Sequence, residues 1–158
     1  MKKILLFVLG VFAGIVGAAT VGGSIATKDI KKWKNMSNKH FNLFLLMNEW
    51  MRRKQEGKHI RYYFEKHGYK SVALYGLSYV GERLLDELRE CGVEIKYIVD
   101  RNAESLYSDV DIFTIEDRLP EADVMIVTAV YFFDEIYSSL INKIKCPIVS
   151  LEDVLCEL

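Results

Sequence analysis

A chain of 158 residues has room for about one globular domain. Hydrophobic side chains make up 51% of it, and its mean hydropathy is slightly positive, which is high for a soluble domain. Residues 28–70 carry 12 basic and 4 acidic side chains, a net of +8, whereas residues 71–158 carry 7 basic and 18 acidic ones, a net of −11. This acidic C-terminal part excludes nucleic acid as the partner, since phosphate binding needs a positive footprint.

The first 27 residues predict a transmembrane helix. Residues 4–26 contain no charged side chain and, at ~1.5 Å per residue, span roughly 35 Å as a helix, enough for a hydrocarbon core of about 30 Å. A cleaved signal peptide is the alternative, because Lys2, Lys3 and the small residues 18–20 fit its flanks. The apolar regions of signal peptides are shorter, about 7–15 residues, so the length favours a retained anchor.

Flanking charge predicts the orientation of this anchor. Only Lys2, Lys3 and the terminal amine precede the apolar stretch, and one acid, Asp29, follows it among five lysines: Lys28, Lys31, Lys32, Lys34 and Lys39. The positive-inside rule therefore favours a single-pass protein of the cell membrane with a cytoplasmic C-terminal domain. The basic segment would be drawn to the anionic inner leaflet, while the acidic body would be held away from it.

Residues 28–69 are expected to form a basic neck and a helical lead-in. Ser37 or Asn38 is a suitable cap for a helix that runs to about residue 56, with Gly57 as its stop. A second short helix is expected at about 59–67. A coiled-coil surface for a partner is the alternative interpretation, but no heptad is sustained long enough to favour it.

Residues 70–158 alternate short apolar runs with segments of helical periodicity. We expect strands at 72–75, 94–99, 112–113, 123–128 and 147–149, and helices at about 79–91, 134–144 and 151–158. This alternation predicts an α/β fold with a Rossmann-like parallel sheet of about five strands. The expected strand order is 3-2-1-4-5, as in half of a dinucleotide-binding fold.

The sharpest motif lies between the first strand and the first helix of this domain. In a dinucleotide fingerprint the first glycine makes the turn, the second admits the pyrophosphate and the third allows close helix–strand packing. Gly76 and Gly81 match the first and third positions, whereas Ser78 replaces the second. The motif thus predicts a phosphate-binding turn with one departure from the pattern.

Two further features extend this candidate site. The N-terminus of the helix at Tyr79 and Val80 offers free N–H groups to an anion. Asp100 ends the second strand, 19 residues after Gly81, where an acid would accept from a ribose hydroxyl. The competing interpretation is that the glycines only make the turn and that Asp100 only caps it.

The C-terminal domain resembles the small Rossmann-like nucleotide-binding domains of surface-polysaccharide and sugar-modifying proteins. Among these are the N-terminal domain of sugar O- and N-acyltransferases and the C-terminal domain of sugar C-methyltransferases. The resemblance covers about residues 70–155 and is carried by the segments at 72–81, 98–102, 124–129 and 148–155. It implies a nucleotide, NAD(P) or a nucleotide-sugar, at residues 76–81, at Asp100 and Arg101, and at the loop after Thr128. The catalytic domain that accompanies such modules has no counterpart in this sequence.

No catalytic residue stands out. Tyr62 and Lys66 have the spacing of the pair in short-chain dehydrogenases, but they precede the first strand instead of following the fourth. The three cysteines show neither a zinc nor a disulfide spacing, which indicates free thiols in a reducing compartment and no metal site: Cys91, Cys146 and Cys156.

The leading hypothesis is therefore a membrane-anchored, non-catalytic nucleotide-binding module in cell-surface polysaccharide biosynthesis, acting as a homo-oligomer or with a partner enzyme. An NAD(P)-dependent oxidoreductase, whole or as a subunit, is the first alternative. A ligand-free interaction scaffold is the second, since fold alone does not confer a function.

Overall fold

The computed structural model describes residue 32 and residues 34–158. The chain divides into two units, Met1–Leu43 and Phe44–Leu158. Of the first unit, residues 32 and 34–43 are described, and they are helical. The transmembrane helix predicted within residues 1–27 lies outside the described residues. Among the residues that are described, no helix combines the length and the apolar composition that a bilayer crossing requires.

The lead-in helix begins earlier than the sequence indicated. Residues 34–55 are helical, so the predicted start at Ser37 or Asn38 is wrong. Both side chains are good caps, but a cap preference of about 1 kcal/mol is overridden when neighbouring turns continue the helix. The predicted stop is confirmed, because the helix ends before Gly57, whose φ is +74°. The short helix α2, Arg61–His67, follows and ends at Gly68.

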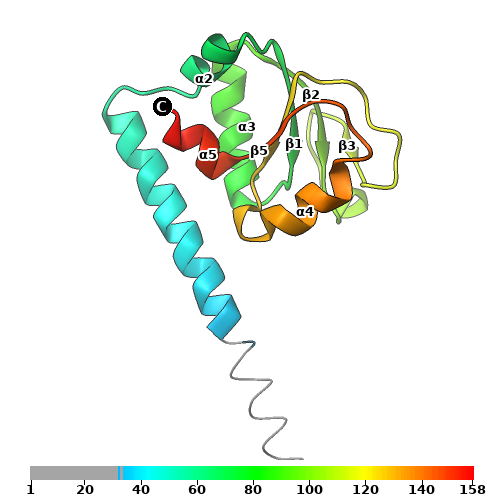
Figure 1. Cartoon of the computed structure of the whole chain (residues 1–158), viewed down its shortest axis with the longest axis horizontal. Coiled ribbons are helices and arrows are strands. Elements are labelled where there is room, and N and C mark those ends of the chain that lie inside the picture. Colours follow the sequence, from blue (N-terminus) through cyan, green and yellow to red (C-terminus); the bar gives the residue numbers. More distant parts are fainter. Residues whose placement is uncertain (1–31, 33) are drawn as a thin grey trace, which may run out of the picture. The chain divides into compact units, whose positions relative to one another are not determined.

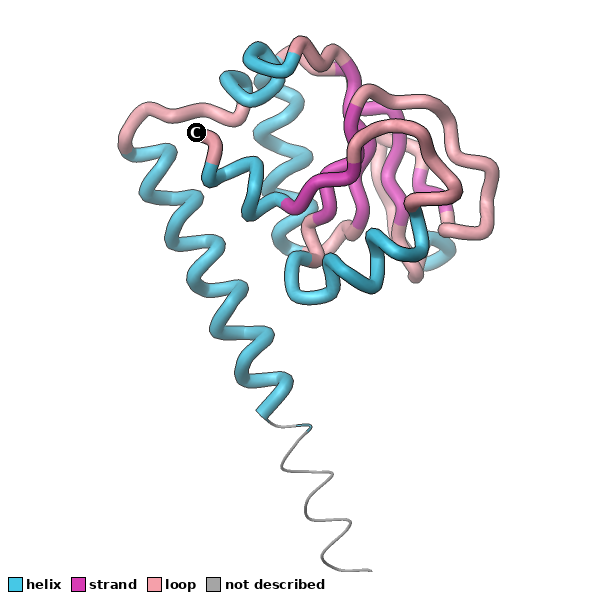
Figure 2. The backbone as a smooth tube through the Cα atoms, viewed as in Figure 1, coloured by secondary structure: helices cyan, strands magenta, loops and turns pink. Residues whose placement is uncertain are grey.

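The second unit contains an α/β fold with a five-stranded sheet (Figures 1 and 2). All its strand pairs are parallel, and the order is β3-β2-β1-β4-β5, which confirms the predicted topology. The strands are β1 (Ser71–Tyr75), β2 (Glu94–Val99), β3 (Ile112–Phe113), β4 (Val124–Val127) and β5 (Ile148–Ser150). The helices after β1 are α3 (Tyr79–Cys91), α4 (Phe133–Leu140) and α5 (Leu151–Cys156), with short 3₁₀ turns η1 (Ala103–Ser105) and η2 (Val130–Phe132).

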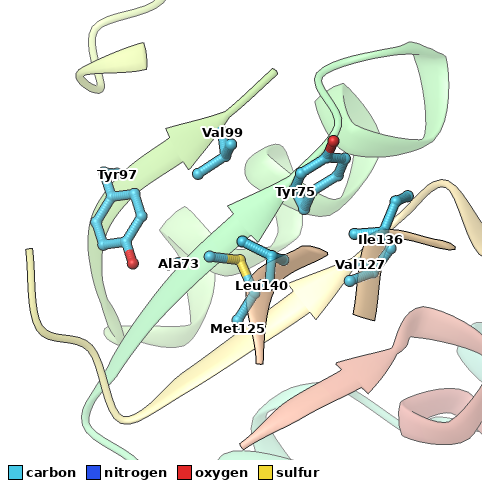
Figure 3. Packing of buried hydrophobic residues seen from close by; sticks show 8 residues of the cluster. All are labelled: Ala73, Tyr75, Tyr97, Val99, Met125, Val127, Ile136 and Leu140. Carbon is cyan, nitrogen blue, oxygen red and sulfur yellow. The ribbon is translucent and has the colours of Figure 1, made fainter. Parts of the chain in front are cut away.

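Helices cover both faces of the sheet. Every residue of β1 is buried, as expected of a central parallel strand. Ala73 and Tyr75 face a cluster with Ile136 and Leu140 of α4 (Figure 3). Because side chains alternate along a strand, Val72 and Leu74 point to the opposite face, where α3 lies (Figure 1). This arrangement places the N-terminus of α3 at the carboxyl edge of the sheet.

Two connections of the sheet are short, and the first of them is shorter than expected. The helix after β4 ends at Leu140, although 134–144 was predicted, because Leu140 is the last residue of that helix buried against the sheet. Residues 141–143 continue as a turn. Between β2 and β3 there is only the 3₁₀ turn η1, since so few residues leave no room for a crossover helix.

A buried carboxylate joins the lead-in to the sheet domain. Glu87 of α3 is 6% exposed and accepts a hydrogen bond from Trp50 Nε1 at 2.9 Å and one from the backbone N–H of Ile60 at 3.4 Å. Lys54 Nζ lies 3.2 Å from the same carboxylate. A buried charge requires such partners, so Glu87 fixes residues 50–60 on α3.

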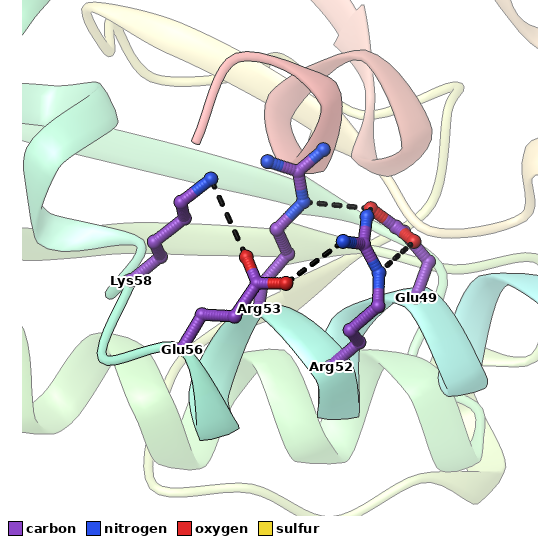
Figure 4. A network of polar contacts seen from close by, with 5 residues as sticks. All are labelled: Glu49, Arg52, Arg53, Glu56 and Lys58. Carbon is purple, nitrogen blue, oxygen red and sulfur yellow. Dashed lines mark hydrogen bonds and ion pairs between the residues drawn. The ribbon is translucent and has the colours of Figure 1, made fainter.

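A second polar network lies on the surface of the lead-in helix (Figure 4). Glu49 pairs with Arg52 and Arg53, and Glu56 pairs with Arg52 and Lys58. Hydrogen bonds from the two guanidinium groups lower the pKa of Glu49 to about 2. Exposed pairs of this kind add little stability. Their consequence is that both carboxylates on this side are paired with cations of residues 52–58.

Candidate functional site

The predicted site residues meet at the carboxyl edge of the sheet. Gly76 follows β1, Asp100 follows β2 and Thr128 follows β4, and these three strands are neighbours. The order of the strands reverses between β1 and β4. In open α/β sheets, ligands bind at this topological switch point. The fold therefore brings residues that are 24–52 positions apart in sequence to one edge.

Both glycines of the motif are required by geometry. Gly76 has a φ of +97°, a conformation that side chains disfavour, and a Cβ there would lie 2.8 Å from Thr128 Oγ1. A Cβ on Gly81 would lie 2.1 Å from the carbonyl oxygen of Gly76. The first glycine thus makes the turn, and the third lets α3 approach β1, as in the fingerprint.

Thr128 stabilises the turn through hydrogen bonds to its backbone. Its side chain is buried, and its hydroxyl lies 3.1 Å from the carbonyl oxygen of Tyr75 and 2.8 Å from that of Gly76, to which it donates. Its backbone N–H also donates to Tyr75. The family resemblance implied a ligand contact at Thr128, whereas its hydroxyl is bonded to the backbone of the turn.

Asp100 is bonded to the turn through one oxygen. Its Oδ2 accepts from the backbone N–H of Leu77, and its Oδ1 accepts from that of Asn102, both at 2.8 Å. An ionised carboxylate offers about four acceptor positions, so each oxygen keeps one for a further donor. The capping interpretation and the ribose interpretation are therefore compatible. The bond to Leu77 was not predicted, because nothing in the spacing of the sequence indicates which amide the carboxylate would reach.

The N-terminus of α3 is open to solvent. Ser78 is its N-cap, with an extended backbone, an exposed side chain and no capping hydrogen bond. The N–H groups of the first turn, at Tyr79 and Val80, have no intrahelical acceptor. The side chain of Val80 is buried, whereas that of Tyr79 is 83% exposed. Uncapped amides at a helix N-terminus are suited to an anion such as phosphate.

Exposed side chains surround this edge. Arg101 follows Asp100 and is exposed. Tyr131 and Phe132 follow β4, are 38% and 37% exposed, and have their rings edge to face at 5.2 Å. Their exposure leaves both rings accessible at this edge of the sheet. Tyr131 also lines a depression of about 270 Å³ with Ser150.

The alternative catalytic candidates lie elsewhere. Tyr62 is half exposed on α2, before the sheet, and Lys66 pairs with Glu157 at 2.8 Å. Burial raises the pKa of the thiols of Cys91 and Cys146, which keeps them protonated at neutral pH. Across residues 34–158, no three acidic, histidine or cysteine side chains are grouped as metal ligands.

The chain was also compared with known proteins. The comparisons with protein-family models, with curated proteins and with solved structures found no match.

Proposed function

We propose that this protein binds a nucleotide, NAD or a nucleotide-sugar, at the carboxyl edge of its sheet. The observation that carries the proposal is the turn at residues 76–81, which meets two of the three geometric requirements of a dinucleotide fingerprint and leads into an uncapped helix. Its position at the topological switch point supports the same proposal.

The chemistry of the site suggests how such a ligand would lie. A phosphate would accept from the amides of Tyr79 and Val80, where the helix dipole favours negative charge. A ribose diol would donate to the two acceptor positions left on Asp100. The carboxylate would repel a phosphate at the ribose 2′ position, so NAD should bind better than NADP. Arg101, being exposed beside Asp100, is free to approach a sugar or a second phosphate.

A non-catalytic role fits the described site best. Its polar groups are backbone amides, a carboxylate already bonded to two amides and a threonine bonded to two carbonyls. None of these is placed as a nucleophile with an adjacent base. We therefore propose a module that binds its ligand without converting it. An assay of cofactor turnover tests the enzyme alternative.

We infer the cellular setting from the sequence alone. The uncharged residues 4–26 support a single-pass anchor in the cell membrane, and the lysines after them support a cytoplasmic domain. The resemblance to domains of sugar-modifying proteins supports a role in cell-surface polysaccharide biosynthesis.

A thermal-shift screen of the full chain in detergent tests this proposal. The compounds are NAD, NADP, UDP-glucose, coenzyme A and S-adenosylmethionine. A ligand at ~100 times its Kd adds about 2.7 kcal/mol of stability, which raises the Tm by several degrees. We expect a shift from NAD or UDP-glucose and a smaller one from NADP. If a folded chain responds to none of the compounds, the ligand-free scaffold replaces this proposal, whereas turnover of a bound cofactor would make it an enzyme.

A further inference from the structure

We propose that the exposed face of residues 44–55 pairs with the same face of a second copy of this chain, as a short parallel two-stranded coil. This face is independent of the nucleotide site. The inference rests on one part of the proposed function, the membrane anchor. This anchor would hold two copies on the same membrane surface with their helices parallel.

The helix presents apolar side chains on the side that does not pack on its own domain. Leu46 and Trp50 are buried at 6% and 4% exposure and form the packed face. Phe44 and Met51 are 63% and 57% exposed. A phenylalanine and a methionine exposed one heptad apart on the same side of a helix are placed where a second helix would cover both.

The spacing of the exposed face selects a helix as its partner. Phe44, Asn48, Met51 and Gln55 are all exposed and follow one another at intervals of four, three and four residues. Because 3.5 residues per turn is the repeat of a coiled-coil seam, these four positions match the inner line of a short one. The repeat is too short to favour a coiled coil by itself, and the exposure of all four positions is the observation that supports it. In the sequence the same spacing extends one step back, to Phe41.

Asn48 makes the second copy a better partner than a lipid surface. It lies between Phe44 and Met51 on the line of four exposed side chains. A bilayer would have to desolvate this amide without a partner, which is costly. In a parallel pair of helices, two asparagines at one inner position bond to each other and fix the register and the two-stranded state.

Charge beside the seam does not oppose the pairing. Arg52 is next to the line, but its guanidinium is paired with Glu49 and Glu56 of its own helix (Figure 4). Two copies therefore bring neutralised pairs together at this position. A seam of about two heptads is weak in solution, but anchoring in one membrane raises the effective concentration of the two copies.

Disulfide cross-linking of the full chain in its membrane tests the seam. Met51→Cys places a thiol on the seam and keeps Asn48, and Asn142→Cys, in the exposed turn after α4, is the matched control. Under a mild oxidant we expect at least ten times more covalent dimer from Met51→Cys than from Asn142→Cys or the native chain. Adding Phe44→Glu to Met51→Cys should abolish this dimer, whereas adding Ile141→Glu, another exposed apolar residue, should leave it unchanged.

The outcomes separate the seam from the anchor. Equal, low cross-linking from the two cysteines, with the chain in the membrane fraction, overturns the seam and leaves the anchor standing. Protection of the Met51→Cys thiol from a water-soluble maleimide without cross-linking assigns the face to the bilayer and also overturns the seam. Recovery of the chain in the soluble fraction overturns the anchor on which the inference rests.

Discussion

The carboxylate of Asp100 accepts a hydrogen bond from the backbone N–H of Leu77 at 2.8 Å, and this bond ties the end of β2 to the turn between β1 and α3. The two residues are 23 positions apart. Leu77 is buried, so its amide has little access to water as an alternative acceptor. The turn that we assign to phosphate binding is therefore held in shape before any ligand arrives.

Replacing Asp100 should loosen this turn. Asp100→Ala leaves the Leu77 amide without its acceptor, and an unsatisfied buried donor costs about 1–3 kcal/mol. Asp100→Asn keeps one carbonyl oxygen and should cost less. Urea unfolding of both variants measures the difference. An Asp100→Ala chain as stable as the native one would show that the bond does not hold the turn.

Gly81→Ala should lower the stability of the fold, although alanine is the better helix former. Alanine normally stabilises a helix relative to glycine by about 1 kcal/mol, but here its Cβ would lie 2.1 Å from the backbone oxygen of Gly76. Since that neighbour is backbone and cannot rotate away, we expect a loss of about 3 kcal/mol or more. Gly57→Ala is the control, because no atom lies within 4 Å of its Cβ position and only the cost of its positive φ, about 1 kcal/mol, remains. Equal losses in urea unfolding would contradict the packing role of Gly81.

Tyr97→Phe should maintain or raise stability. Among the described residues, the Tyr97 hydroxyl is the one buried side-chain polar atom without a hydrogen-bond partner, and burial raises the pKa of Tyr97 to about 12. Its ring packs edge to face on Phe113 at 5.7 Å, and Phe keeps this contact. Removing an unsatisfied hydroxyl removes its desolvation cost, so we expect a gain of up to ~1 kcal/mol in the free energy of unfolding. A clear loss would mean that an ordered water or another group satisfies the hydroxyl.

Asp123 should make folding sensitive to acid. Its carboxylate accepts from the backbone N–H groups of Lys70 and Ser71, both at 2.8 Å, and these bonds lower its pKa below the usual 3.8. A lowered folded pKa adds stability above about pH 3.8, and this contribution disappears as the pH falls through the folded pKa. The native chain should therefore exceed Asp123→Asn in stability at pH 7, with a gap that narrows below about pH 4. Urea unfolding from pH 7 to pH 2 tests this prediction, with Glu121→Gln, at an exposed position, as the control. A stability difference that does not change with pH would show that the ionisation of Asp123 is not coupled to folding.

Much of the fold was predictable from local patterns. The run at 72–75, the glycine after it and the helical period that follows each point to one β–α unit. The strand order was predicted from half of a dinucleotide-binding fold. The start of the lead-in helix was not predictable, because Ser37 and Asn38 have good cap chemistry and are nonetheless inside a helix. Capping preferences are small beside the cooperativity of a continuing helix.

The candidate site was predictable in position and less so in detail. The two glycines were identified with their roles, because a strand–turn–helix motif imposes them. The role of Thr128 was not predictable. Its hydroxyl is bonded to the turn carbonyls, and only the fold brings these groups together. The role of Glu87 was not predicted either. Nothing in the sequence indicates that this helical glutamate accepts a hydrogen bond from a tryptophan 37 positions earlier.

The central claim is that a nucleotide phosphate binds at the N-terminus of α3, and substitution of its cap residue tests it most directly. Asp and Asn are equally good N-caps, so Ser78→Asp and Ser78→Asn should be equally stable, while only the first adds a negative charge beside the phosphate. At an effective dielectric constant of 20, two unit charges 4 Å apart repel by about 4 kcal/mol, and every 1.4 kcal/mol is tenfold in affinity.

Isothermal titration of the two full-length variants with NAD and with UDP-glucose is the measurement. We expect Ser78→Asn to bind one of the two nucleotides within about threefold of the native affinity and Ser78→Asp to bind it at least ~10 times more weakly. Equal affinity of the two variants, or the absence of binding by the folded native chain, would contradict the assignment of this turn as a nucleotide site.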